Sequence, residues 1–363
     1  MNTILCLRHS RRYQKHERNK ISRKIRWKQM NREKESIPIF FTIDDGYAPF
    51  LGVALSSMLK NASRDYHYEV FVIYQELSRQ NREKLASCKT GQSEIHFVRM
   101  KEKLEMIQDH ISNRLRADYF TLTIYFRLFI PEMFPQFDKG IYLDSDIVVP
   151  GDISRLYQTQ LGDHLLGAAV DPAVSEIPEL ERYVRLCVGV DPGKYFNSGV
   201  LLMNLRELRK ANLAGRFLRM LSRYHFDTIA PDQDYLNALC SGRVTYLSKE
   251  WDTMPSVSNK KKPETAIDNG EINYETGVPK LIHYNLFAKP WYYDGIQYEE
   301  YFWHYAPDSG FLDEIQNIKA SYTDKDRQSD SEHMALIIAR GDNSSKNPVT
   351  FRIVFTEGKE ARL

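Results

Sequence analysis

Two aspartates, Asp144 and Asp146, follow the apolar run at residues 140–143, with Ser145 between them. Side chains two positions apart on an extended segment point the same way, so both carboxylates can reach one ion. Carboxylate oxygens suit magnesium or manganese, and these ions commonly hold substrate phosphates. A solvated turn has the same pattern, but the apolar residues before it favour the end of a buried strand. The spacing therefore predicts a site for a metal and a phosphate.

The elements around this pair predict an α/β fold. Apolar runs indicate buried strands, and helical spacing of apolar residues indicates the helices between them. The expected strands span 38–43, 69–74, 94–98, 140–143, 166–170 and 199–204, and the expected helices span 48–59, 78–88, 125–130 and 213–224, with another opening near Asp232. The alternation predicts a Rossmann-like mixed sheet flanked by helices, with ligands at the carboxyl ends of the strands.

The rest of the chain gives three local predictions. Residues 255–277 have the composition of a surface loop, and the apolar residues at 349–355 favour a strand. The aromatic residues between Trp291 and Tyr305 favour a helix packed on the domain, with acceptor stacking or an interfacial belt as the alternative. We expect a domain at 37–305 that closes with a small helical portion, followed by an extension at 306–363.

The charge of the chain is divided unevenly. Residues 1–36 hold 12 Lys and Arg against 3 Asp and Glu, a net charge of +9. Subtracting this from the +2 of the whole chain leaves −7 for residues 37–363. Because residues 37–363 carry a net negative charge, we do not expect this part of the chain to bind nucleic acid, which needs a basic surface. The basic arm at 1–36 predicts either a disordered tail or electrostatic attachment to an anionic membrane surface or to nucleic acid.

The cysteines and the start of the chain indicate the cellular compartment of the protein. The chain has 4 cysteines, Cys6, Cys88, Cys187 and Cys240, too widely spaced for a cysteine metal site or a dense disulfide framework. The beginning of the chain has apolar residues before basic ones, the reverse of a secretory signal. We therefore expect a cytoplasmic protein, with a peripheral position at the inner face of the membrane as the alternative.

Two enzyme classes fit the aspartate pair. In haloacid-dehalogenase phosphatases a strand ends in DxDx[TV] and the first aspartate is the nucleophile, a pattern that Asp144 to Val148 matches. In sugar-nucleotide transferases a DxD pair holds the metal on a diphosphate. The phosphatase strand usually opens its domain, whereas about 100 residues of βα structure precede Asp144 here, which favours the transferase. A non-catalytic protein that binds sugar nucleotides or carbohydrate is a further alternative.

Six segments, taken together, resemble the retaining glycosyltransferase family eight. They are FTIDDGY at 41–47, TIYFRL at 123–128, YLDSD at 142–146, YFNSGVLLMN at 195–204, DQDYLN at 232–237, and IHY at 282–284 with KPW at 289–291. The resemblance spans about residues 37–305. It implies a GT-A fold, a UDP-glucose or UDP-galactose donor, manganese (with magnesium as the alternative) as cofactor, and a saccharide, lipid-linked or protein acceptor.

The resemblance also implies roles for individual residues. Asp144, Asp146 and His283 correspond to the metal ligands, and one imidazole with two carboxylates favours manganese. The other residues that correspond to the donor pocket are Thr42, Asp44, Asp45, Gly46, Tyr47, Arg127, Ser145, Asn197, Ser198, Asp232, Gln233 and Lys289.

The catalytic group implied by the resemblance is Gln233, with Asp232 and Asn197 around the sugar. An amide is a weak nucleophile, so attack on the same face as the departing diphosphate is favoured over a covalent glycosyl-enzyme. Two positions depart from the family pattern. Leu286 replaces the usual glycine three residues after His283, and Tyr119 replaces a histidine near the diphosphate.

Overall fold

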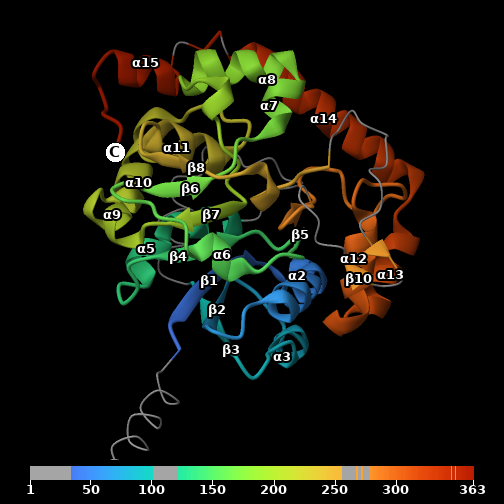
Figure 1. The fold of residues 1–363 in the computed structure, drawn as a ribbon. Helices are drawn as coiled ribbons and strands as arrows, with labels where there is room; N and C mark the ends of the chain where they lie inside the picture. The colour runs from blue at the N-terminus through green and yellow to red at the C-terminus, as the bar shows by residue number, and fades with distance from the viewer. Residues whose placement is uncertain are drawn as a thin grey trace, which may run out of the picture.

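The computed structural model describes residues 34–100, 122–255, 267–268, 271–272, 278–344, 346–347 and 349–363. Within them, a seven-stranded sheet has the order β3-β2-β1-β4-β7-β6-β8 (Figure 1). The strands are β1 (Ser36–Ile43), β2 (His67–Tyr74), β3 (Ser93–Arg99), β4 (Gly140–Leu143), β6 (Leu166–Ala168), β7 (Val200–Met203) and β8 (Val244–Tyr246). The predicted α/β fold with a Rossmann-like mixed sheet is confirmed.

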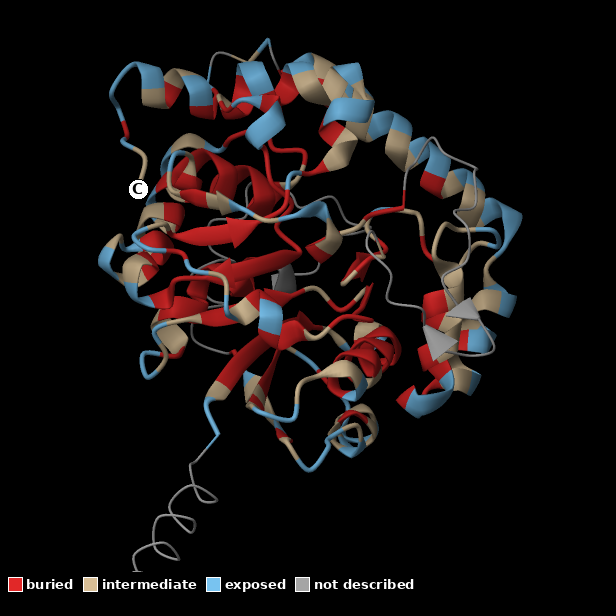
Figure 2. Cartoon of the chain, in the orientation of Figure 1, coloured by how far each residue is buried: buried red, intermediate tan, exposed pale blue. Residues whose placement is uncertain are grey.

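The sheet has a parallel half and a mixed half. β3, β2, β1 and β4 run parallel to one another, whereas β7 is antiparallel to both β4 and β6. Alternate residues of β1 enter different cores: Phe40 packs on one face and Phe41 on the other. Both faces are buried by helices, which explains the uninterrupted apolar runs in these strands (Figure 2).

Helices cover both faces of the sheet and form the periphery. They are α2 (Ala48–Asn61), α3 (Arg79–Ser87), α5 (Ile130–Met133), α6 (Ile153–Tyr157), α7 (Pro172–Glu176), α8 (Pro178–Tyr183), α9 (Leu205–Lys210), α10 (Leu213–Tyr224), α11 (Pro231–Cys240), α12 (Glu299–Tyr305), α13 (Leu312–Ser321), α14 (Asp324–Ser344) and α15 (Phe351–Thr356). None of the described helices is both long enough and apolar enough to cross a membrane.

Two local predictions are wrong. The helix expected at 125–130 is a 3-10 helix, Leu122–Phe129, and Pro131 lies in the first turn of α5 instead of ending a helix. Proline fits that position because the first helical N–H groups have no intrahelical acceptor. The strand expected at 349–355 is α15, whose N-cap Thr350 accepts from the backbone of Ile353 at 3.2 Å.

The aromatic residues after Pro290 belong to the core, as the packing prediction expected. Trp291 is fully buried and stacks on Phe50 of α2, with ring centroids 4.1 Å apart. Tyr301 and Phe302 of α12 are buried in the same apolar cluster. Most of the loop expected at 255–277 lies outside the described residues. In its described part, β9 (Ile267–Asp268) and β10 (Glu271–Ile272) pair antiparallel.

Two short strands extend the carboxyl edge of the sheet. β5 (Ile147–Val148) follows the aspartate pair, and β11 (Ile282–His283) runs antiparallel to it. His283 is in register with Ile147. The pairing therefore joins the segment that carries the two aspartates to a segment more than a hundred residues later.

Candidate active site

A cavity of about 320 Å³ opens at the carboxyl edge of β1 and β4. Its walls come from the loop after β1, the β4–β5 turn, residues 197–199 before β7, the first turn of α11 and the loop after β11. All but two of the residues predicted for the site line it: Thr42, Asp44, Tyr47, Arg127, Asp144, Ser145, Asp146, Asn197, Ser198, Asp232, Gln233, His283 and Lys289. The fold thus brings the six sequence segments to one place.

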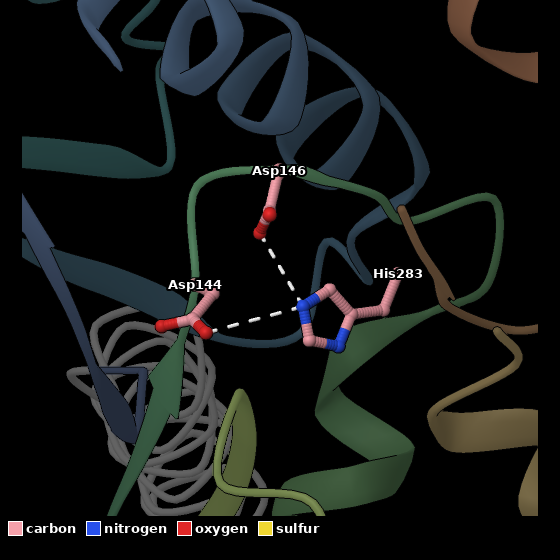
Figure 3. A group of neighbouring side chains, drawn as sticks. All are labelled: Asp144, Asp146 and His283. Atoms are coloured by element: carbon pink, nitrogen blue, oxygen red, sulfur yellow. Dashed lines mark ion pairs between the residues drawn. The ribbon is translucent and has the colours of Figure 1, made fainter. Parts of the chain in front are cut away.

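Asp144, Asp146 and His283 form a group suited to a metal ion (Figure 3). One ligand atom from each lies within 4.8 Å of the others. Nε2 of His283 is 3.3 Å from Oδ1 of Asp146 and 3.9 Å from Oδ2 of Asp144. Two carboxylates and an imidazole, converging on one point, fit the predicted divalent cation by donor type and by spacing.

Asp252, a residue that sequence reasoning missed, holds the imidazole in place. Its Oδ1 lies 3.1 Å from Nδ1 of His283, and burial raises the pKa of this carboxyl to about 6. A carboxylate at Nδ1 places the proton there and leaves the lone pair of Nε2 facing the aspartate pair, as a metal ligand requires. Asp252 follows no predicted strand, so nothing in the local sequence indicated this contact.

Gly199 explains how the three ligands approach so closely. A Cβ atom at this position would lie 2.3 Å from Cε1 of His283 and 2.7 Å from Oδ2 of Asp144. The backbone carbonyl of Gly199 also accepts from the N–H of Asp144 at 2.7 Å. A side chain at residue 199 would therefore displace two of the three ligands.

Arg127 links Asp144 to Asp232 within the cavity. Its Nη2 donates to Oδ1 of Asp144 at 2.8 Å, and its Nε lies 3.2 Å from Oδ2 of Asp232. Nη1 donates to the carbonyl of Ser198 at 2.6 Å. Burial would lower the pKa of this guanidinium, but the two carboxylates raise it above its usual range. The arginine is thus a fixed cation at the centre of the site.

Lys289 supplies a second cation. It is buried and forms an ion pair with Oδ2 of Asp146. Burial would raise the pKa of Asp146, but Lys289 and His283 lower it well below its usual range. The aspartate is therefore ionised across the physiological pH range, as a metal ligand must be.

Gln233 is held at both ends of its amide. Its Oε1 accepts from the backbone N–H of Ser198 at 2.9 Å, and its Nε2 donates to Oδ2 of Asp171 at 2.8 Å. The same Asp171 oxygen accepts from Nδ2 of Asn197 at 3.3 Å. Asp171 was not predicted, although it follows the expected strand at 166–170 as Asp144 follows its own. The pair of amides therefore has a fixed orientation toward the cavity.

Asp45 and Gly46 are the two predicted residues that do not line the cavity. Oδ1 of Asp45 accepts from the backbone N–H of Ser78 at 2.7 Å and from Nδ2 of Asn81 at 2.9 Å, at the start of α3. Its neighbour Asp44 lines the cavity and caps the turn by accepting from the N–H of Tyr47 at 3.1 Å. The structure thus brings Asp44 and Tyr47, but not Asp45, to the site.

Leu286 keeps the backbone conformation that a glycine would favour. Its φ of 49° lies in the left-handed region, at a cost of about 1–2 kcal/mol for a residue with a Cβ. The loop therefore follows a path suited to glycine while its side chain, 38% exposed, lines the cavity. Tyr119, the other departure, lies outside the described residues.

Comparisons with known proteins match most of this chain. The profile of glycosyl transferase family 8 matches residues 38–295. General stress protein A of Bacillus subtilis is 26% identical over 265 residues, 72% of this chain and 89% of that protein. Lipopolysaccharide 1,2-glucosyltransferase of Escherichia coli K12 is 29% identical over 263 residues, which are 71% of this chain and 73% of that protein. A crystal structure of an active-site mutant of LgtC is 29% identical with a TM-score of 0.62, covering 75% of this chain and 96% of LgtC.

Proposed function

The chain belongs to glycosyl transferase family 8, and from that premise we propose that it transfers a hexose from a UDP-sugar to an acceptor, in a metal-dependent reaction that retains the anomeric configuration. The observation that carries the proposal is the meeting of a metal-binding triad and two buried cations, Arg127 and Lys289, in one cavity. A divalent cation held by this triad, next to these two cations, would suit a diphosphate, which leaves a sugar readily only when its charge is neutralised.

The metal would be held by Asp144, Asp146 and His283. Once bound there, manganese acts as a Lewis acid that neutralises charge on the diphosphate, and magnesium is the weaker alternative because an imidazole ligand favours the softer ion. Lys289 and Arg127 flank this position and add fixed positive charge from the protein. These side chains therefore stabilise the leaving group without any proton transfer.

The residues around the sugar support retention by attack on the face from which the diphosphate departs. Both ends of the Gln233 amide are hydrogen bonded, which keeps its side chain in place beside the sugar and makes it a poor nucleophile. Asp232 is buried against Arg127 and Ser198, where it can accept from a sugar hydroxyl. Gln233, Asp232 and Asn197 thus position the hexose and stabilise positive charge at its reacting carbon.

The residues of the cavity and the names of the relatives support the donor and acceptor classes that we propose. The resemblance assigns Thr42, Asp44 and Tyr47 to the uridine, and all three line the cavity. The relatives are named as a lipopolysaccharide glucosyltransferase and as the galactosyltransferase LgtC, which supports UDP-glucose or UDP-galactose as donor. We propose lipopolysaccharide or another cell-surface glycan as the product. The proposed setting is the cytoplasm, at the inner face of the membrane, because the basic arm favours anionic lipid.

A screen of UDP-sugars for UDP release tests this proposal. UDP-glucose or UDP-galactose should be hydrolysed slowly in manganese without any acceptor, and other nucleotide sugars should not be. Saccharides that accelerate UDP release then identify the acceptor. Family membership argues against the phosphatase alternative, and a chain that binds UDP-sugars but never releases UDP would instead be a non-catalytic binding protein.

A further inference from the structure

α14 runs from the region of α12 and α13 to α8 (Figure 1) and lies beyond the part of the chain that the family profile matches. His333, Met334, Leu336 and Ile337, near the middle of this helix, line the same cavity as the metal triad. No motif in the sequence predicts a role for this segment. The wall it forms is therefore a feature of this chain that the six family segments do not contain.

The first half of α14 is fixed to the loop that carries Lys289. Asp330 is buried and accepts from the hydroxyl of Tyr293 at 2.6 Å and from that of Tyr322 at 2.5 Å. Nη1 of Arg327 donates to the carbonyl of Tyr322 at 3.1 Å. Tyr293 lies four residues after Lys289, so these contacts tie the helix directly to the donor side of the cavity.

The second half of α14 is fixed to the opposite side. Oγ of Ser344 donates to Asp227 at 2.9 Å, and Arg340 forms an ion pair with the same carboxylate. Gly341 is buried against Ile229 and α8, where a Cβ atom would lie 3.1 Å from Cδ1 of Ile229 and 3.5 Å from the carbonyl oxygen of Glu179. Because both ends are held, the middle of the helix is a fixed wall of the cavity.

The surface that this wall presents is largely aliphatic. Leu336 is 62% exposed, and Leu286, which faces the same cavity from the donor loop, is 38% exposed. Val174 of α7 and Leu180 of α8 line the cavity as well. Large aliphatic side chains that remain exposed along one cavity indicate a ligand with an apolar part.

A sugar ring alone does not suit this wall. Sugar hydroxyls lose hydrogen bonds to water on binding and must find polar partners, which aliphatic side chains cannot provide. Polar partners are found instead in a hydrogen-bonded network that Arg127 connects to Asp144, made up of Asp171, Asn197, Asp232 and Gln233. The aliphatic side is continuous with them, so an acceptor could place its sugar among the polar groups and an apolar chain against α14.

We propose that α14 forms an acceptor subsite for an aliphatic chain, and hence that the acceptor is a lipid-linked or other alkyl-bearing glycoside. The inference rests on the proposed function, because the acceptor must share the cavity with the donor. Among the acceptor classes considered, it selects the lipid-linked class over a free saccharide. Leu336, Met334 and Leu286 are then the residues that determine this preference.

Calorimetric binding of methyl and octyl β-D-glucoside to the full chain tests the proposal. Each methylene moved out of water contributes about fourfold in affinity, so burial of even two should make the octyl compound bind at least about tenfold more tightly. One octyl molecule should bind per chain. Leu336→Asp should remove the preference, because a carboxylate replaces an aliphatic contact. Ala335→Asp is the matched control, since residue 335 is exposed on the same helix and does not line the cavity.

The outcomes separate this inference from the proposed function. Equal affinity for the two glycosides, or an equal loss of preference in Leu336→Asp and Ala335→Asp, would overturn the subsite. UDP binding in manganese is measured on the same samples and should be unchanged in both variants. If the wild-type chain fails to bind UDP, the proposed function fails, while the glycoside comparison still decides the subsite.

Discussion

The backbone N–H of Tyr284 donates a 2.9 Å hydrogen bond to the carbonyl of Asp146. This bond and the pairing of His283 with Ile147 hold the two metal-binding segments together through the backbone. The position of the imidazole relative to the aspartates is therefore set by strand pairing as well as by the side chains. A ligand fixed in this way can be replaced without unfolding the surrounding core.

The first prediction concerns the metal. Asp146→Asn preserves the shape of the side chain but removes a charged ligand, so UDP release should fall by about two orders of magnitude or more. The chain should stay folded, because Asp146 lines a cavity and not the apolar core, but its melting temperature should fall because the buried ammonium of Lys289 loses its partner. Steady-state UDP release and thermal unfolding measure the two effects. Full activity in a chelator would refute the metal site.

The imidazole gives a second prediction, on metal preference. His283→Ala removes the nitrogen ligand and leaves two carboxylates, which favour harder ions. Activity in manganese should fall, and the ratio of magnesium to manganese activity should rise above that of the wild type. Asp252→Asn, which changes only the partner of Nδ1, should lower the affinity for manganese by about 10-fold to 100-fold without changing the preference. An unchanged ratio in His283→Ala would exclude the imidazole as a ligand.

Gly199 allows a third prediction, independent of ligand chemistry. In Gly199→Ala the new methyl group would meet both His283 and Asp144, so manganese binding and UDP release should both be largely lost. Gly91→Ala is the control, because a Cβ at residue 91 meets no atom within 4 Å. Manganese titration by calorimetry compares the two variants. Normal manganese affinity in Gly199→Ala would show that the ligands tolerate a wider separation.

Some residues of the site could be predicted from local sequence patterns, others only from the family resemblance. Asp144 and Asp146 could be predicted because strand geometry, hydropathy and ligand chemistry act within a few residues. The convergence of His283, Arg127 and Lys289 on them could be predicted only through the family resemblance, since no local pattern relates segments so far apart. Asp252 and the middle of α14 were not predicted, because their roles depend on tertiary packing alone.

The strand expected at 349–355 is a helix for a reason that its packing shows. The apolar residues at 349–355 fit a strand by composition, but Phe351 and Val354 are three positions apart and are both buried, as on one face of a helix. Phe351 stacks on Phe226 at 3.9 Å, so tertiary packing selects the helical spacing. In a run this short, periodicity alone does not separate a helix from a strand.

A fourth prediction concerns the stereochemistry and Gln233. If the attack occurs on the face of the departing diphosphate, the new linkage has the same α configuration as the donor. Gln233→Ala should slow transfer without abolishing it, because the amide stabilises charge and forms no bond. NMR of the product identifies the configuration, and UDP release gives the rate. A β linkage would contradict the retaining mechanism.

The last prediction is a pH dependence that arises from Asp234. This carboxyl is fully buried beside the hydroxyls of Tyr195 and Tyr183, each 2.7 Å away, and the backbone N–H groups of Ile229 and Ala230. Burial raises its pKa to about 6, although these hydrogen bonds partly oppose the rise. Because the unfolded value is about 3.9, the folded state binds the proton more tightly, and this group's contribution to stability falls as the pH rises from about 4 to about 6.

Tyr195→Phe should make this dependence steeper. The hydroxyl of Tyr195 stabilises the ionised carboxylate more than the protonated form, so its loss should cost about 2 kcal/mol at pH 7.5 and about 1 kcal/mol at pH 5. Tyr246→Phe removes a hydroxyl that donates to a neutral carbonyl, that of Lys194, and should cost the same at both pH values. Urea unfolding of the three proteins at the two pH values measures the difference. A cost for Tyr195→Phe that does not grow with pH would mean that Asp234 is ionised throughout this range, because the carboxylate then gains no charge between pH 5 and pH 7.5.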